Sequence, residues 1–255
     1  MVNKNDISYL IQLIDQAGTS ALAFYKGDNT TTIKSDNSPV TKADIASHEV
    51  IHRGLSKFNL PVISEESTES HGIKSDRYWL IDPLDGTKEF INHSAEFTVN
   101  IALIEGNKPV FGIVSAPALK QIWYGGKGVG SHKLDSGQET KIICRPVNAN
   151  NLVSLVSKSH SNKSDLEKFY KSNNLSDVIE KPAGSSLKIC YIAEGKADIY
   201  PRLGPTMEWD IAAAQSVIEN SGGFIYTESG AMKYGKKELL NPHFVASGFK
   251  RKYIF

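Results

Sequence analysis

Apolar residues recur at helical spacing in the first sixty residues of the chain. The first set follows the candidate caps Asn5 and Asp6, ends before Gly27, and comprises Ile7, Leu10, Ile11, Ile14, Ala17, Ala21 and Phe24. The second set follows Val40-Thr41 and comprises Ile45, His48, Ile51, Leu55 and Phe58. Because positions three and four apart share one face of a helix, both sets predict amphipathic helices. The polar, turn-rich residues 28–39 between them predict a loop or an irregular hairpin.

The middle of the chain instead has short apolar runs separated by turn residues. They span residues 61–64, 77–81, 97–104, 109–114 and 121–124. The runs 97–104 and 109–114 flank Glu105-Gly106-Asn107-Lys108, which predicts an antiparallel hairpin continued as a meander. The glycines at 125, 126, 128 and 130 predict a turn, because no helix follows them to form a phosphate-binding loop.

After residue 140 the pattern changes to strands that alternate with helices. Strands are predicted over 152–156, 197–200, 224–226 and 244–246, and helices over 163–173, 185–194 and 210–220. This alternation is typical of a parallel or mixed sheet. We therefore expect an α+β part with an antiparallel meander in residues 1–140 and an α/β part with a mixed sheet in residues 141–255, with the active site between them.

Composition and charge narrow the class of protein. The 255 residues, 40% hydrophobic and 22% charged, are ordinary for a globular chain of one large domain or two closely packed ones. The net charge of +1 provides no overall field that would favour nucleic acid or an anionic membrane. No apolar run reaches the roughly 18 residues of a membrane span.

The cysteines and the N-terminus indicate the cellular compartment in which the protein is expected. Cys144 and Cys190 lie in apolar surroundings, which favours two buried thiols over a disulfide and a reducing compartment. The polar N-terminus lacks the basic and apolar blocks of a signal peptide. A cytoplasmic location is therefore expected.

The segment Trp79-Leu80-Ile81-Asp82-Pro83-Leu84-Asp85-Gly86-Thr87 carries the strongest chemical signal. An apolar strand leads into two carboxylates, and the proline between them removes a backbone donor and fixes φ, so we expect the sheet to end in a turn there. Carboxylates at one point repel each other unless a cation lies between them, and Mg²⁺ prefers such oxygen ligands. Taken alone, the motif is equally compatible with a solvated Asx turn.

Three further acidic residues stand at the ends of predicted elements. Asp44 lies near a helix start, Glu65 at a strand end, and Asp210 at the opening of a helix. Asp44 and Asp210 could each be helix caps, and Glu65 could be a surface acid. Glu66 competes with Glu65 for any role, and spacing does not choose between them.

Together these motifs resemble the signatures of the inositol monophosphatase superfamily. The matching segments are 37–44, 63–66, 79–87 and 209–214. Within that superfamily the chain is most similar to the bacterial 3′(2′),5′-bisphosphate nucleotidases, over segments 77–91, 96–104, 157–160, 184–188 and 200–206. The resemblance implies a layered αβαβα fold of the sugar-phosphatase type. It also implies lithium-sensitive, Mg²⁺-dependent hydrolysis of 3′-phosphoadenosine 5′-phosphate to AMP and phosphate, which clears a by-product of sulfate assimilation.

The resemblance also implies roles for the acidic residues. Two or three Mg²⁺ ions would be held by Glu65, Asp82, the carbonyl of Leu84, Asp85 and Asp210. The nucleophile would be a water activated by these ions, with Thr87 orienting it and Asp44 orienting Thr87 or taking the proton. Gly86 and Thr87 would also offer backbone N–H groups to a phosphate oxygen.

The second phosphate of such a substrate requires a cation outside the metal cluster. Lys188 and Arg202 are the candidates, with Ser185 as a neutral donor that shares a helix face with Lys188. By resemblance, Gly184 and Asp210 also contact substrate, and His160 would bond to or stack on the adenine or ribose. Without the resemblance, Lys188 and Arg202 could equally be solvated surface residues, and His160 could equally be an exposed turn residue.

Other functions stay open at this stage. A sister phosphatase acting on inositol monophosphate or fructose 1,6-bisphosphate would share the metal motifs, although a basic residue in 184–188 favours a second phosphate. A non-catalytic metal or nucleotide sensor would be expected to have lost a ligand acid or Thr87, and none is missing. The oligomeric state stays open, as does a peripheral position on the cytoplasmic side of the inner membrane.

Overall fold

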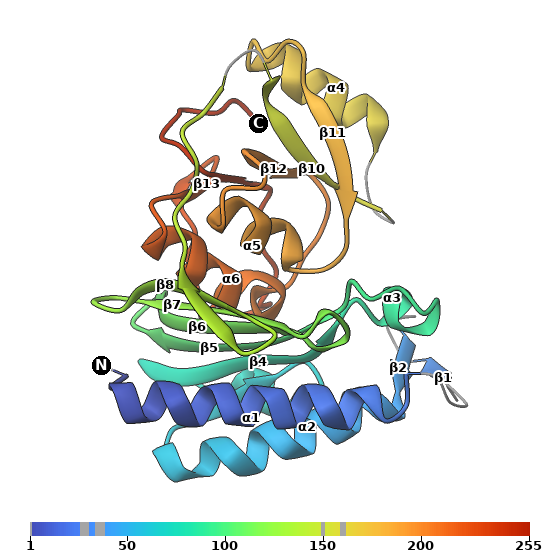
Figure 1. Cartoon of the computed structure of the whole chain (residues 1–255), viewed down its shortest axis with the longest axis vertical. Coiled ribbons are helices and arrows are strands. Elements are labelled where there is room, and N and C mark those ends of the chain that lie inside the picture. The colour runs from blue at the N-terminus through green and yellow to red at the C-terminus, as the bar shows by residue number, and fades with distance from the viewer. Residues whose placement is uncertain (1, 26–30, 34–38, 149–150, 159–161) are drawn as a thin grey trace.

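Five layers of helices and sheets lie one on another in the computed structural model (Figure 1), which describes residues 2–25, 31–33, 39–148, 151–158 and 162–255. Two helices cover a seven-stranded sheet, two more helices lie between that sheet and a six-stranded one, and a further helix closes the far side. This is the predicted αβαβα order. None of the helices in these ranges combines the length and apolar character that a membrane span requires.

The first layer consists of α1 (Lys4–Leu22) and α2 (Lys42–Leu55). Asn3 caps α1, so this helix begins earlier than the candidate caps Asn5 and Asp6 suggested. Between the helices, β1 (Thr31–Ile33) pairs antiparallel with β2 (Pro39–Thr41), which confirms the irregular hairpin. Ile45 is exposed although it was assigned to the apolar face of α2, because the buried face is formed by Ala43, Asp44, Ser47, Ile51 and Leu55.

The seven-stranded sheet runs in sequence order. Its strands are β3 (Val62–Ser64), β4 (Arg77–Asp85), β5 (Thr98–Glu105), β6 (Lys108–Ala116), β7 (Gln121–Gly126), β8 (Gly130–Asp135) and β9 (Gln138–Lys141). β3 and β4 are parallel and the rest form the predicted antiparallel meander. The predicted glycine turn is wrong at Gly125, Gly126 and Gly130, which belong to strands. Gly125 is needed there because a Cβ would lie 3.0 Å from Cα of Val217 in a helix above.

β4 continues through the acidic motif, so the prediction that the sheet ends before it is wrong. Its pairing with β5 shifts between Asp82 and Asp85, and Pro83 lies in this irregularity, where a missing donor costs no ladder bond. The turn comes at Gly86, whose φ of +90° is left-handed, and the short helix α3 (Thr87–Ile91) follows. Asp82 and Asp85 therefore project from one bulged strand end.

The second sheet is mixed, as predicted, in the order β11-β10-β12-β15-β13-β14. Its strands are β10 (Val153–Ser157), β11 (Ile179–Ala183), β12 (Ile199–Arg202), β13 (Phe224–Thr227), β14 (Gly230–Ala231) and β15 (Phe244–Ser247). β10 is parallel to β11 and β12, and the other pairs are antiparallel. β11 carries no burial pattern that could have predicted it, since its first four residues are exposed. The outer helix is α4 (Lys163–Ser172).

The middle layer consists of α5 (Leu187–Ala193) and α6 (Glu208–Asn220). α6 lies so close to the first sheet that a Cβ on Gly112 of β6 would come within 2.1 Å of the Ala213 carbonyl oxygen. The backbone of the helix therefore rests directly on the strand. This contact fixes the first turn of α6, where Asp210 lies, relative to the strands of the sheet.

Short 3₁₀ turns complete the described elements: Ser56–Phe58, Thr68–Gly72 and Pro117–Leu119. Both cysteines are free, and Cys190 is fully buried whereas Cys144 is half-buried. The first sheet ends at Lys141, and α5 and α6 from the following part of the chain cover it. The division into parts 1–140 and 141–255 stays a prediction.

Candidate active site

A cavity of about 1060 Å³ opens where the ends of β3 and β4 meet the first turns of α5 and α6. Eight predicted site residues line it: Glu65, Asp85, Gly86, Thr87, Ser185, Lys188, Arg202 and Asp210. Asp44, Asp82 and Leu84 are buried and do not form its wall. Gly184 does not line the cavity either, and His160 lies outside the described residues.

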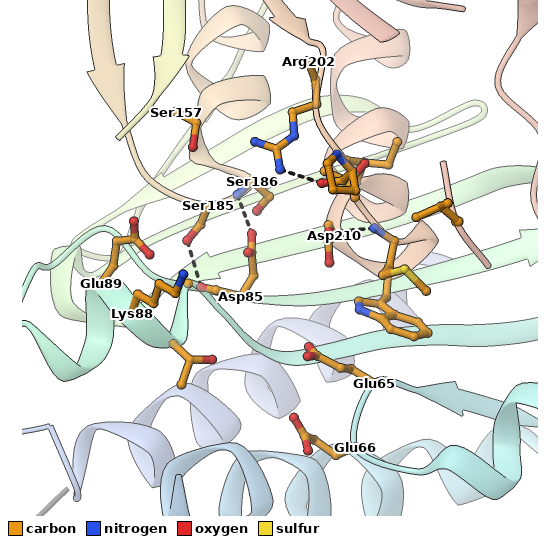
Figure 2. Close-up of a pocket in the computed structure, with 18 of the residues that line it drawn as sticks. Glu65, Glu66, Asp85, Lys88, Glu89, Ser157, Ser185, Ser186, Arg202 and Asp210 are labelled. Atoms are coloured by element: carbon orange, nitrogen blue, oxygen red, sulfur yellow. Dashed lines mark hydrogen bonds between the residues drawn. The ribbon is translucent and has the colours of Figure 1, made fainter. Parts of the chain in front are cut away.

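Carboxylates from three elements face one another at the base of this cavity (Figure 2), with Asp85 from β4, Glu65 from the end of β3 and Asp210 from α6. The pKa of Asp82 is raised well above its usual value by burial and then by Glu65, Asp85 and Asp210. Burial, Asp85 and Glu65 likewise raise the pKa of Asp210. The four acids therefore form one electrostatic unit that is costly to charge without a cation.

The structure separates the roles of Glu65 and Glu66, which both line the cavity. Glu65 hydrogen bonds with Asp82 and acts on the pKa of both Asp82 and Asp210. Glu66 instead acts on the pKa of Asp44. The glutamate that joins the aspartates is thus Glu65.

Asp44 is both a member of the capping box of α2, whose N-cap is Thr41, and a neighbour of Thr87. Its Oδ2 accepts hydrogen bonds from the backbone and hydroxyl of Thr41, at 2.7 and 2.6 Å, which completes the capping box. Its Oδ1 accepts from the Thr87 hydroxyl at 3.4 Å, and the Leu84 carbonyl is a second acceptor at the same distance. Burial raises the pKa of Asp44 to about 6. The carboxylate is therefore charged at neutral pH and close to the range of a general base.

Asp85 is held by the second part of the chain. Its Oδ2 accepts from the Ser186 backbone N–H at 2.7 Å, and its carbonyl oxygen accepts from the Ser185 hydroxyl at 2.8 Å. Burial raises the pKa of Asp85 to about 6, although Lys188 and the Ser186 hydrogen bond oppose the rise. The turn before α5 is thus fastened to the strand that bears two of the acids.

Two buried cations also line the cavity. Lys188 is 5% exposed and its Nζ donates to the carbonyls of Ala183 and Ser185, at 3.2 and 2.8 Å. Burial lowers the pKa of Lys188 to about 8. Arg202 donates to the Pro205 carbonyl at 2.6 Å, and its buried Nε has no hydrogen-bond partner among the described residues. An ammonium has three donors, so one remains on Lys188 for a ligand.

Ser185 does not lie on the helix with Lys188, so the prediction of a shared helix face is wrong. Its φ is +51°, a left-handed conformation in the turn before α5. Both side chains nevertheless reach the cavity, because the turn folds back against Asp85.

The model of the inositol monophosphatase family matches residues 4–252. The chain belongs to this family. It is 40% identical over 246 residues to the 3′(2′),5′-bisphosphate nucleotidase CysQ of Salmonella typhimurium, covering 93% of this chain and 98% of that one. It is 39% identical over 249 residues to the nucleotidase of the same name from Escherichia coli K12, covering 94% and 99%.

Solved structures of this family share the fold. The crystal structure of CysQ from Bacteroides thetaiotaomicron matches with a TM-score of 0.83 and 32% identity, covering 97% of this chain and 98% of that one. An IMPase from Thermotoga maritima matches with a TM-score of 0.77 over 96% and 92% of the two chains. At 24% identity the second match bears on the fold alone.

Membership of the inositol monophosphatase family implies a divalent metal cofactor, and the donor set fits one. Burial and the carboxyl groups of Glu65, Asp85 and Asp210 raise the pKa of Asp82, so these groups lie close together. Carboxylate oxygens are the ligands that hard divalent cations prefer. Lys188 and Arg202 lower the pKa of Asp85, whereas the largest influences on the pKa of Asp82 all raise it. Within the described ranges, no three His, Cys, Asp or Glu side chains have the arrangement of a formed metal site. The fit therefore rests on charge and donor chemistry.

The cavity wall includes side chains that the sequence did not single out. An apolar side is formed by Ile45, Met207, Trp209 and Leu240, with the ring of His71 5.0 Å from that of Trp209. No sequence signal distinguished Ile45 from a core residue, since it fits the helical spacing of α2. A smaller cavity of about 100 Å³ adjoins the first at Ser157, Tyr200 and Arg202.

Proposed function

We propose that this protein is a 3′(2′),5′-bisphosphate nucleotidase that hydrolyses 3′-phosphoadenosine 5′-phosphate to AMP and phosphate, with Mg²⁺ as its cofactor. The observation that carries the proposal is one cavity lined by charges of both signs. Carboxylates of the cluster and the buried cations Lys188 and Arg202 line the same wall. The relatives named as 3′(2′),5′-bisphosphate nucleotidases, 40% and 39% identical over nearly the whole chain, support it.

The two sets of charged residues match a substrate with two phosphates. The reacting phosphate belongs at the carboxylates, since metal ions there would offset its charge and that of the acids. The second phosphate belongs with Lys188 and Arg202, where a free ammonium hydrogen and the unpartnered Nε of Arg202 are available. The main cavity, at about 1060 Å³, offers room for the rest of a nucleotide.

We assign Mg²⁺ to Glu65, Asp82, the Leu84 carbonyl, Asp85 and Asp210. When bound, Mg²⁺ supplies positive charge to the phosphoryl oxygens and lowers the pKa of a coordinated water. Because the acids come from β3, β4 and α6, the site depends on the contact between α6 and the first sheet.

Within the chain, Thr87 and Asp44 are proposed to handle the proton. The Thr87 hydroxyl lies in the cavity wall with Asp44 and the Leu84 carbonyl as acceptors behind it. A water that donates to Thr87 can pass a proton toward Asp44, whose pKa of about 6 suits an acceptor at neutral pH. The backbone N–H groups of Gly86 and Thr87 are proposed to bind a phosphate oxygen.

Kinetics on a substrate panel test the proposal. The chain should release phosphate from 3′-phosphoadenosine 5′-phosphate in Mg²⁺ and lose that activity in excess EDTA. Its kcat/KM should be lower for adenosine 3′-phosphate, inositol 1-phosphate and fructose 1,6-bisphosphate. A higher kcat/KM for inositol 1-phosphate would transfer the proposal to the inositol phosphatases. No phosphate release from any of them in Mg²⁺ would favour a non-catalytic sensor.

A further inference from the structure

Glu96 joins three segments of the chain just outside the cavity. It lies before β5, and its Oε2 accepts from the Gly184 backbone N–H at 2.8 Å and pairs with Nζ of Lys158 at 2.9 Å. Its backbone carbonyl accepts from the Ser185 hydroxyl at 3.0 Å. The side chain is about three-quarters buried, with 26% of it exposed. One residue therefore ties the end of β10 and the turn before α5 to the first sheet.

The turn that Glu96 holds is the one that positions Lys188. The two carbonyls that accept from the Lys188 ammonium belong to Ala183 and Ser185, which flank Gly184 on either side. A shift of Gly184 would move both acceptors together. The location of the ammonium thus depends on the contact between Gly184 and Glu96.

The contact leaves no room for adjustment. A Cβ added to Gly184 would lie 2.4 Å from the carbonyl oxygen of Glu96 and 2.9 Å from the Cβ of Glu96. The following residue, Ser185, has a left-handed backbone with φ of +51°, which a non-glycine residue adopts only under constraint. The hydrogen bonds that Gly184 and Ser185 donate to Glu96 and Asp85 supply that constraint.

We propose that Glu96 is a positioning residue that sets the preference for a substrate with a second phosphate, by holding the Gly184 turn so that Lys188 presents its free hydrogen to that phosphate. This inference rests on the proposed function, in which Lys188 binds the second phosphate. It gives Glu96 no contact with the reacting atoms.

The negative charge of Glu96 has an opposite effect, because a carboxylate near Lys188 would repel a substrate phosphate. The pair with Lys158 offsets most of that charge at close range. The Gly184 hydrogen bond to a charged acceptor is also stronger than one between neutral groups. Positioning should therefore outweigh repulsion, and removing the side chain should weaken substrate binding.

Steady-state kinetics on two matched substrates test this. 3′-Phosphoadenosine 5′-phosphate and adenosine 3′-phosphate differ only in the 5′-phosphate. Glu96→Ala should raise KM for the bisphosphate about tenfold, with kcat changed less than about threefold, and should leave both constants for the monophosphate nearly unchanged. Glu96→Gln keeps an oxygen acceptor for Gly184, so it should recover most of the wild-type KM.

Two further variants complete the design. Lys158→Met removes the ion pair but leaves the Gly184 hydrogen bond, and should resemble Glu96→Gln. Glu105→Ala, at the exposed far end of β5, the strand that follows Glu96, should change neither substrate's constants. If Glu96→Ala does not fold, Glu96→Asp decides, because it keeps the charge while its shorter side chain draws the acceptor away from the Gly184 N–H. A bisphosphate KM raised more than that of the monophosphate supports the inference, and equal KM values or equal changes for the two substrates overturn it.

The outcomes separate this inference from the proposed function. Equal losses on both substrates, or a lower KM for the bisphosphate in Glu96→Ala, would overturn the role of Glu96 while leaving the nucleotidase proposal intact. A wild-type enzyme that does not prefer the bisphosphate over the monophosphate would overturn the second-phosphate site itself.

Discussion

Thr87 and Asp44 lie 43 residues apart in the chain and meet behind the cavity wall, where the Thr87 hydroxyl donates to Oδ1 of Asp44 at 3.4 Å. The other oxygen of Asp44 accepts from Thr41 and completes the capping box of α2. Capping and proton transfer are therefore compatible roles for one carboxylate. The cap fixes the orientation in which the second oxygen faces Thr87.

Asp44→Asn should lower kcat by roughly 100- to 10,000-fold with little change in KM, because an amide cannot take the proton while it can still accept from the Thr41 N–H. Asp6→Asn is the matched control, since Asp6 completes the corresponding capping box of α1 far from the cavity. It should leave kcat unchanged. Wild-type turnover in Asp44→Asn would remove Asp44 from the reaction.

The stability of the metal-free protein should depend on Asp44 in a defined direction. Its pKa is about 6 in the folded chain against 3.8 when solvated, so the folded state binds the proton more tightly. This contribution is fully present below pH 4 and is lost as pH rises through 6, a change of roughly 3 kcal/mol. In EDTA, the free energy of unfolding of the wild type minus that of Asp44→Asn should fall between pH 4 and 7. A flat or rising difference would contradict the assigned pKa.

Asp82→Asn should separate stability from activity. Asn keeps an acceptor for the Leu84 N–H, which donates to Oδ1 of Asp82 at 3.0 Å, while it removes one charge from the cluster. In EDTA the variant should therefore melt at a higher temperature than the wild type. It should gain less from added Mg²⁺ and lose most of its phosphatase activity. Wild-type turnover at saturating Mg²⁺ would refute Asp82 as a ligand.

Lithium should inhibit in the millimolar range or below. Li⁺ is similar in size to Mg²⁺ but carries half its charge, so it can occupy a carboxylate site without supporting turnover. Phosphate release should be measured at fixed Mg²⁺ in LiCl and in equal concentrations of NaCl and KCl. Equal effects of the three salts would exclude a specific lithium site.

Lys188→Met should reduce kcat/KM for 3′-phosphoadenosine 5′-phosphate about 10- to 150-fold, since a charged hydrogen bond to phosphate is worth roughly 1.5–3 kcal/mol. Methionine preserves the buried stem of the side chain. Arg202→Met should behave alike, and the double variant should lose less than the two single losses combined, because both cations face one group. An equal fall for adenosine 3′-phosphate would place Lys188 in folding or catalysis instead.

Apolar periodicity predicted the elements whose burial is one-sided or complete, such as α1, α2, β5 and β6. It missed β9 and β11, because their exposed residues form strands through backbone pairing that leaves no hydrophobic pattern. The end of β4 was placed too early, since the strand passes Pro83 through a bulge that the composition of the segment does not reveal.

The site shows the same division. Acidic residues at element ends gave the candidates, but their convergence depends on which strands and helices meet, and this came from the family resemblance. Spacing could not choose between Glu65 and Glu66, whereas in the fold Glu65 acts on Asp82 and Asp210 and Glu66 acts on Asp44. The bond from Glu96 to Gly184 joins residues 88 positions apart, and no local pattern encodes such a pairing.

The backbone contact between α6 and Gly112 has a consequence for how substrate preference can change during evolution. A helix that touches a strand through its own backbone keeps its place when neighbouring side chains are exchanged. The first turn of α6, which carries Asp210, is thereby held to the sheet by a contact that does not involve the side chains of Lys188 and Arg202. We therefore expect exchanges at those two positions to change which substrate is preferred while Asp210 keeps its place.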